Sequence, residues 1–310
     1  MLFLHLFYAK MKYIYLIYGG LFCLFMVMIS CREEVDTHYP EFTPKPVINS
    51  ILIVGEPITA HISIAVGYEE PSLSGCDNAT VSLFIDNLFA GEMTWQEEGL
   101  YRIDTLVRSN TTYTLSVEIP GYETASGSTH IPPVTEYYDL THINVAGLNE
   151  EGDSYPAIEF TFPVEPHHTH FFDARIILNA EGEIVSDLTP IYRSDSVLLN
   201  EGLPLTVFSD TILKGVEEYR MHINYTTGSY TYDDLMGNVT VLYPLLLEFR
   251  SVSKEYYLYA RQRYLYERGR FPEFGIGSNT AYPLYSNVEN GYGLVAGYAP
   301  FATDTLKPSY

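Results

Sequence analysis

The chain has 310 residues, of which 39 are acidic and 17 are Lys or Arg, giving a net charge of −22 at neutral pH. Such an acidic chain lacks the cationic excess that binding to nucleic-acid phosphates requires, so we exclude nucleic acid as a partner. Two of its three cysteines lie within or directly after an N-terminal apolar segment, so no disulfide framework can form within one chain.

The N-terminal segment, residues 1–30, predicts a signal peptide. Lys12 belongs to a short basic stretch, and an apolar, aromatic run follows from Tyr13 to Ile29. A basic start, an apolar middle and a small residue at the end are the features of such a peptide. We expect translation to start at Met11, with Met1 as the alternative, because the residues before Met11 add only a second apolar patch.

The residues after the apolar run distinguish a cleaved signal from a membrane-spanning anchor. A run of about 17 apolar residues is just long enough to cross a bilayer, but a spanning helix is normally followed by Lys or Arg. Here Arg32 is followed at once by Glu33 and Glu34. We therefore predict cleavage. Removal of residues 1–30 takes away two lysines and no acidic residue, so the net charge moves from −22 to −24.

The end of the apolar run predicts a lipid anchor. The sequence from Met28 to Cys31 resembles the bacterial lipobox, with Met28 in the place where Leu is usual. We predict cleavage after Ser30 and lipidation of the Cys31 thiol and amine. Several acyl chains, each worth about 0.8 kcal/mol per buried methylene, anchor a protein permanently. The acidic pair Glu33 and Glu34 resembles the signal that directs Bacteroidetes lipoproteins to the outer leaflet.

Strand signals dominate residues 47–133, which follow a lipidated tether at 31–46. Three segments are rich in β-branched and aromatic residues, namely Val47–Val54, Thr80–Asp86 and Thr112–Glu118. Turn residues separate such segments at short intervals, at Gly55-Glu56-Pro57, Asp86-Asn87, Gly99 and Pro120-Gly121. This spacing predicts an immunoglobulin-like β-sandwich. The pattern stops at Ile131-Pro132-Pro133, where we place a domain boundary.

Residues 134–310 predict a second β-rich domain with one helix. The expected strands are Ala157–Phe162, Phe171–Leu178, Gly202–Phe208, Glu218–Tyr225 and Val239–Phe249. A helix is expected at about 253–267, with Ser253 as N-cap and an end near Gly269. Its apolar stripe, which should face the core, consists of Tyr257, Ala260 and Tyr264. Asn290-Gly291 predicts a turn into a last strand. The fold class is thus mainly β.

The order of several segments resembles the family named domain of unknown function 4249. The segments are "NATVSLFIDN" with "GLYRIDTL", "YTLSVEIPGYETASGSTHIPP", "LEFRSVSKEYYLYARQRY" and "SNVENGYGLVAGY". Members of this family are typically outer-membrane lipoproteins of Bacteroidetes encoded beside TonB-dependent transporters. The resemblance implies a compartment and a transporter partner, and it implies no known chemistry. The first domain also resembles the transthyretin-like sandwiches that accompany such transporters.

The segment Glu165-Pro-His-His-Thr-His170 contains the candidate metal ligands. In an extended strand, His168 and His170 point the same way, and with Glu165 they offer two imidazoles and a carboxylate. The spacing matches no known zinc motif, and a solvated loop between strands is the alternative. We therefore predict neither metal nor cofactor, and keep these three residues as the candidates.

Motifs of catalysis are absent from the sequence, which contains no Gly-x-Ser-x-Gly, no His-Glu-x-x-His and no phosphate loop. Gly291–Gly297 is similar to a dinucleotide-binding loop, but its last glycine is one position late. Strand glycines that permit a close backbone approach are the better interpretation. Cys76, the one thiol left after processing, is expected to be a small packed residue. We predict that the protein is not an enzyme.

Basic residues cluster on or beside the predicted helix of a chain otherwise short of positive charge. Arg261, Arg263 and Arg268 lie off the apolar stripe, so reversing their charge should leave the melting temperature nearly unchanged. A solvated face that pairs with local acids is one interpretation. The other is a docking patch, because Tyr and Arg are frequent interface anchors.

Together these observations predict a lipid-anchored protein of the outer membrane that faces the cell exterior. We expect a non-enzymatic accessory to a TonB-dependent transporter, active in nutrient capture or gating. The alternative is a structural or adhesive surface lipoprotein such as a fimbrial subunit, which also uses tandem sandwiches.

Overall fold

The computed structural model describes residues 42–67, 75–152, 154–180, 183–188, 195–225, 229–234, 237–269, 282–303 and 305–308. The described residues from Thr43 onward form one compact unit. The predicted signal peptide, its cleavage site after Ser30, the lipidation site Cys31 and the export signal at Glu33 and Glu34 lie outside the described residues.

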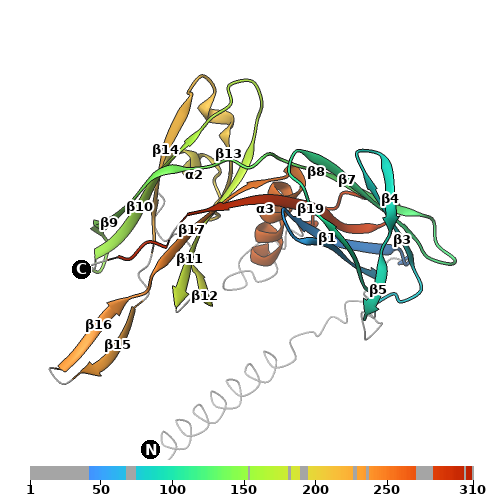
Figure 1. Cartoon of the computed structure of the whole chain (residues 1–310), viewed down its shortest axis with the longest axis horizontal. Helices are drawn as coiled ribbons and strands as arrows, with labels where there is room; N and C mark the ends of the chain where they lie inside the picture. Colours follow the sequence, from blue (N-terminus) through green and yellow to red (C-terminus); the bar gives the residue numbers. More distant parts are fainter. Residues whose placement is uncertain are drawn as a thin grey trace, which may run out of the picture. The chain divides into compact units, whose positions relative to one another are not determined.

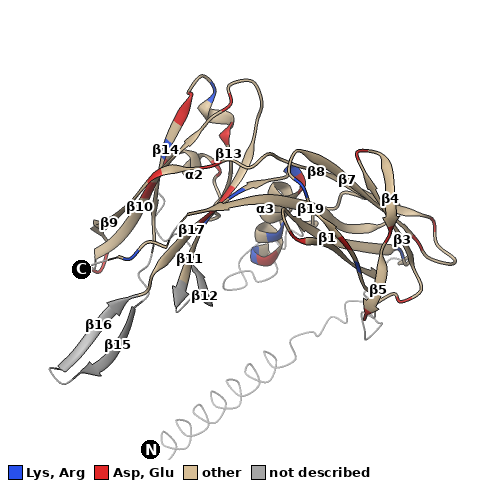
Figure 2. Cartoon of the chain, viewed as in Figure 1, with Lys and Arg blue, Asp and Glu red and all other residues tan. Residues whose placement is uncertain are grey.

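The fold is mainly β, which confirms the predicted class (Figure 1). The strands of the first half are β1 (Pro46–Ile53), β2 (Pro57–Ile64), β3 (Thr80–Ile85), β4 (Leu88–Glu92), β5 (Thr94–Glu97), β6 (Leu100–Leu106), β7 (Thr111–Glu118) and β8 (Ala125–Ile131). Acidic residues are spread over the strands and loops of this half and the next (Figure 2).

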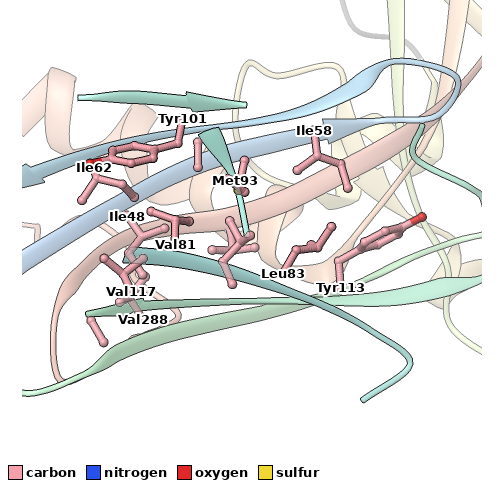
Figure 3. Close-up of a cluster of buried hydrophobic side chains, with 14 of the residues drawn as sticks. Ile48, Ile58, Ile62, Val81, Leu83, Met93, Tyr101, Tyr113, Val117 and Val288 are labelled. Atoms are coloured by element: carbon pink, nitrogen blue, oxygen red, sulfur yellow. The ribbon is translucent and has the colours of Figure 1, made fainter. Parts of the chain in front are cut away.

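The first half forms a β-sandwich. Two late strands, β18 (Val288–Glu289) and β19 (Tyr292–Ala302), take part in it. One layer is the part of a long sheet with the order β19-β1-β2-β6-β5, and the other has the order β18-β8-β7-β3-β4. Buried and partly exposed residues alternate along the strands, because successive side chains of a strand point to opposite faces. In β7, Tyr113, Leu115 and Val117 are buried and the residues between them are not. Figure 3 shows Tyr113 and Val117 in one cluster with Ile48 and Ile58 of the facing layer, and Leu115 belongs to the same cluster.

Two hairpins of this sandwich use the turns that the sequence predicts. Asp86 and Asn87, between β3 and β4, have φ angles of 49° and 66°. Glu98 and Gly99, between β5 and β6, have φ angles of 44° and 78°. Positive φ at both central residues defines the type I′ turn, whose twist matches that of the flanking strands.

The second half contains β9 (Tyr138–Leu148), β10 (Ser154–Pro163), β11 (Phe171–Ala180), β12 (Glu183–Leu188), β13 (Val207–Ser209), β14 (Glu218–Asn224), β15 (Ser229–Asp234), β16 (Gly237–Leu242), β17 (Leu245–Val252), β18 (Val288–Glu289) and β19 (Tyr292–Ala302). It also contains helices α2 (Ser196–Asn200), η1 (Asp210–Leu213) and α3 (Lys254–Gly269). The layer β14-β10-β9 packs against β11 and β17 through an aromatic core. In that core the rings of Phe172 and Phe249 stack with centroids 5.0 Å apart.

Two strand predictions in this half are wrong in their extent. The expected strand Val239–Phe249 is two strands, β16 and β17, because Pro244 between them has no N–H to donate to a ladder. Of the expected strand Gly202–Phe208, only Val207 and Phe208 belong to a strand, β13. Gly202 itself has a φ of +70°, which is incompatible with a strand interior and suits the end of helix α2.

Strand β19 belongs to both halves (Figure 1). Residues 292–298 pair in parallel with β1, and residues 298–302 pair antiparallel with β17, so one sheet runs through both sandwiches. The predicted boundary at residues 131–133 falls between β8 and β9, and β18 and β19 return to the first sandwich. Strand β18 and residues 292–298 of β19, although late in the sequence, are thus structural parts of the N-terminal half.

The glycines of β19 allow a close approach to β1, as predicted. A Cβ atom at Gly293 would lie 2.1 Å from the carbonyl oxygen of Ile48, and one at Gly297 would lie 2.2 Å from that of Leu52. Gly293 also has a φ of +114°, which favours glycine. The turn expected at Asn290-Gly291 is present, with Asn290 at a φ of 54° before β19 begins.

Helix α3 confirms the predicted helix, and its apolar stripe differs from the prediction. Ser253 caps it, since its Oγ accepts a hydrogen bond of 3.2 Å from the Tyr256 amide. Tyr257 and Ala260 pack on a small cluster around Val252, but no residue of α3 is buried. Tyr264 lines an open groove instead of a core. Within the described residues, no helix is long and apolar enough to span a membrane.

Candidate functional site

A groove with a volume of about 590 Å³ runs beside helix α3, between the helix and residues of β1, β11 and β13. Small-molecule sites typically occupy roughly 300–1,000 Å³. Its walls carry three tyrosines and four charged side chains, namely Tyr256, Tyr259, Tyr264, Asp173, Arg175, Arg263 and Glu267. Two of the charged groups are basic and two are acidic, so the groove suits a polar partner of mixed or no net charge.

Two residues that line the groove, Asp173 and Tyr256, belong to a buried charge network. Arg250 is only 8% exposed, and its guanidinium lies 4.3 Å from the ring centroid of Tyr298. Its Nε donates to Glu248, and its Nη1 lies 3.9 Å from Asp173 Oδ2. The Tyr256 hydroxyl donates to the same Asp173 oxygen over 3.1 Å. Burial raises the pKa of Tyr256, which therefore stays protonated as a hydrogen-bond donor.

A second buried network fixes the other side of α3. The carboxylate of Glu201 is 4% exposed and accepts a hydrogen bond from Arg261 Nη1. It also accepts hydrogen bonds of 2.7 Å from the Ser209 amide and from the Tyr257 hydroxyl. Arg261 donates in addition to the Glu201 carbonyl oxygen, over 3.1 Å. Burial, with the hydrogen bond to Glu201, raises the pKa of Tyr257 to about 12.

This geometry corrects the expectation for Arg261. The sequence placed Arg261, Arg263 and Arg268 off the apolar stripe, on a solvated face or a docking patch, whereas Arg261 is the counterion of the buried Glu201. Arg263 and Arg268 remain on the open side of the helix. The Arg263 Nε donates to Glu267 over 2.8 Å with both side chains more than half exposed, and the guanidinium of Arg268 lies 5.5 Å from the Tyr264 ring centroid. Figure 2 shows basic and acidic residues next to one another on α3.

The predicted metal candidates lie in the loop between β10 and β11. Nδ1 of His170 lies 3.2 Å from Oδ2 of Asp210, and the His170 amide donates to Oδ1 of Asp210 over 2.8 Å. On the other side of the ring, Nε2 lies 3.6 Å from Oε2 of Glu165. The hydrogen bond with Asp210 raises the pKa of His170 above its ordinary value against the opposing effect of burial.

The third candidate, His168, is exposed, and its ring centroid lies 6.4 Å from that of His170. Among the residues that the structure describes, no three His, Cys, Asp or Glu side chains already converge as metal ligands. Glu165 and His170 line two cavities, with volumes of about 420 and 640 Å³. Of the three predicted candidates, the structure brings Glu165 and His170 together, whereas the ring of His168 lies apart from them.

Sequence reasoning missed two buried acids that pair with candidate residues, Glu201 and Asp210. They are 60 and 40 residues away from their partners Arg261 and His170. A signal existed for a third acid, Asp195, which precedes the short helix α2 and accepts a hydrogen bond of 2.9 Å from the Val197 amide as its N-cap. Cys76 is 6% exposed in the first core, as predicted for a packed residue.

A family model described as Domain of unknown function (DUF4249) matches residues 32–303. The chain belongs to this DUF4249 family. The match covers both sandwiches, helix α3 and strand β19, so the groove and the histidine loop are both built from the family's own segment. No curated protein and no solved structure matches the chain.

Proposed function

We propose that this protein is a non-enzymatic accessory of a TonB-dependent outer-membrane transporter, anchored by its lipid at the cell surface, that captures or gates a nutrient. The observation that carries the proposal is the groove beside α3, whose walls are rich in Tyr and Arg. The lipid on Cys31 and the address formed by Glu33 and Glu34 supply the location. The transporter partner is the one that the family resemblance implies.

The buried networks support a binding role for the groove. Burying a charge costs several kcal/mol unless it is paired and hydrogen-bonded. The chain nevertheless buries Arg250 and Glu201 on the two sides of α3, each with more than one partner. These contacts hold Tyr256 and Tyr257 in fixed positions. A site that is already rigid loses less conformational entropy when a partner binds.

The open side of α3 supplies groups for a protein partner. Tyr and Arg are enriched among the residues that dominate binding energy. Tyr259 and Tyr264 are half-buried, while Arg263 and Arg268 are exposed. The charges of Arg263 and Arg268 would steer association, because charges at an interface rim mainly affect the on-rate and its salt dependence.

Purification of the tagged protein from native membranes tests this proposal. Wild type should bring down a TonB-dependent transporter, and the double variant R263E/R268E should bring down less of it, with a weaker dependence on salt. The matched control is R102E on β6, an exposed arginine paired with Asp104 over 3.0 Å and outside the groove. Equal recovery of a transporter with the double variant and with the control would mean that Arg263 and Arg268 lie on a solvated face and take no part in docking. Recovery of no transporter with wild type would contradict the proposed function.

One observation favours the structural or adhesive alternative. Strand β4 is an edge strand whose Leu88 and Phe89 are 73% and 60% exposed. Exposed apolar edges can pair with another chain. If the protein is a fimbrial subunit, it should form concentration-dependent polymers that a charge at Phe89, such as F89K, abolishes. Analytical ultracentrifugation of wild type and F89K at several concentrations distinguishes such polymers from a monomer.

A further inference from the structure

We propose that the loop between β10 and β11 binds a divalent transition-metal cation such as Zn²⁺, with Glu165, His168 and His170 as ligands. Asp210 is the positioning residue. This site is separate from the groove beside α3 and does not rest on the transporter proposal.

His170 is held in a fixed orientation by Asp210. Its Nδ1 lies 3.2 Å from Asp210 Oδ2, while the backbone amides of His170 and Asp210 each bond to the other residue, over 2.8 and 3.1 Å. Asp210 is itself buried, with 3% exposure. A metal-binding histidine almost always donates its second ring N–H to a carboxylate or carbonyl, which fixes its tautomer. In the neutral ring, a proton on Nδ1 facing Asp210 leaves the lone pair on Nε2 of His170, which is the nitrogen that can bind a metal.

His170 and Glu165 are spaced nearly as two ligands of one metal ion would be. Nε2 of His170 faces Oε2 of Glu165 at 3.6 Å, which is too long for a hydrogen bond. Two ligands of one tetrahedral zinc ion, with bonds of about 2.0–2.1 Å, lie roughly 3.4 Å apart. The two atoms therefore already stand at nearly the separation that a shared cation imposes, on a nitrogen and an oxygen that both bind zinc.

The third ligand needs a small movement. The ring centroids of His168 and His170 are 6.4 Å apart, whereas two imidazoles on one tetrahedral zinc have centroids roughly 5 Å apart. His168 is exposed, so its side chain can rotate toward Glu165 without disturbing a core. The cavities of about 420 and 640 Å³ beside Glu165 and His170 give an entry path and room for a water molecule in the fourth position.

Titration of the full chain, purified in detergent, with Zn²⁺ in excess Mg²⁺ tests the site by calorimetry. Mg²⁺ suppresses loose binding to the acidic surface, and wild type should bind one Zn²⁺ per chain. The variants H168A and E165Q should weaken the affinity by about tenfold or more, and D210N by about 10–100-fold. The matched control is H167A, which changes an exposed histidine in the same loop outside the proposed ligand set.

The outcomes separate a built site from adventitious binding. Equal weakening by H167A and H168A would overturn the proposal, as would a lack of saturable binding by wild type at about 100 µM Zn²⁺, since a built site of this kind binds far more tightly. D210N removes a buried charge, so its thermal unfolding is measured beside the titration. If D210N does not fold, the comparison of H168A with H167A, both at exposed positions, decides the question.

Discussion

Replacement of Arg261 by alanine should destabilise the protein, in contrast to what a solvated helix face predicts. Removing one partner of a buried ion pair costs about 3–5 kcal/mol, because the other charge is left buried. Two features reduce that cost here. The side chain of Arg261 is 27% exposed, and Glu201 keeps its hydrogen bonds from the Ser209 amide and the Tyr257 hydroxyl. We therefore expect R261A to lower the free energy of unfolding by about 2–3 kcal/mol.

This loss is large enough to measure by thermal unfolding. In domains of 150–250 residues, 1 kcal/mol shifts the melting temperature by about 2–4 °C, so R261A should lower it by roughly 5–10 °C. The matched control is R263A, two residues further along the same helix. Arg263 and Glu267 are 59% and 56% exposed, and pairs of this kind contribute under about 0.5 kcal/mol.

A double variant tests whether the loss of stability in R261A comes from the Glu201 carboxylate, which is left buried without its counterion. In R261A/E201Q no charge is left buried, so it should be more stable than the sum of the two single changes predicts, by about 1–2 kcal/mol. Equal melting temperatures for R261A and R263A would refute the assignment of Arg261 as counterion of Glu201. A purely additive double variant would refute the coupling between them.

Three further predictions concern other parts of the chain. G293A should lower stability by about 3 kcal/mol or more, measured by denaturant unfolding, because a Cβ there meets the Ile48 carbonyl oxygen at 2.1 Å and φ is +114°. The hydrogen bond from His222 lowers the pKa of Glu159, so this carboxylate stabilises the fold above its unfolded pKa of about 4.3 and loses that effect as pH falls through the folded value. E159Q should accordingly cost more stability at pH 7 than at pH 3, and a cost that is equal at both pH values would contradict this. C31A should abolish labelling by a fatty-acid analogue, and unchanged labelling would contradict lipidation.

Local patterns were sufficient for much of the fold. The strands expected at Val47–Val54, Thr80–Asp86 and Thr112–Glu118 each agree with the observed β1, β3 and β7 within one residue at either end. Helix α3 begins directly after the predicted cap Ser253. These elements are determined by neighbours in the sequence, through alternation, turn residues and capping.

Pairings between distant segments could not be predicted in this way. Strand β19 was expected as a strand, but nothing local indicates that it lies parallel to β1, some 245 residues earlier in the sequence. The same limit applies to side chains. Arg261 has the sequence context of a surface residue, and only the folded chain places Glu201 beneath it. At the histidine loop, spacing identified Glu165 and His170, while Asp210 comes from helix η1 in another part of the chain.

Site-specific photo-crosslinking in living cells tests the proposed transporter role most directly. A photoreactive residue at Tyr259 lies in the groove beside α3, and one at Phe89 lies on the edge strand β4 and serves as the comparison. We expect the probe at Tyr259 to form a covalent adduct with a TonB-dependent transporter, identified by mass spectrometry, and the probe at Phe89 to form none. Adducts between copies of this chain through Phe89, without any transporter adduct at Tyr259, would contradict the accessory role and favour a structural one.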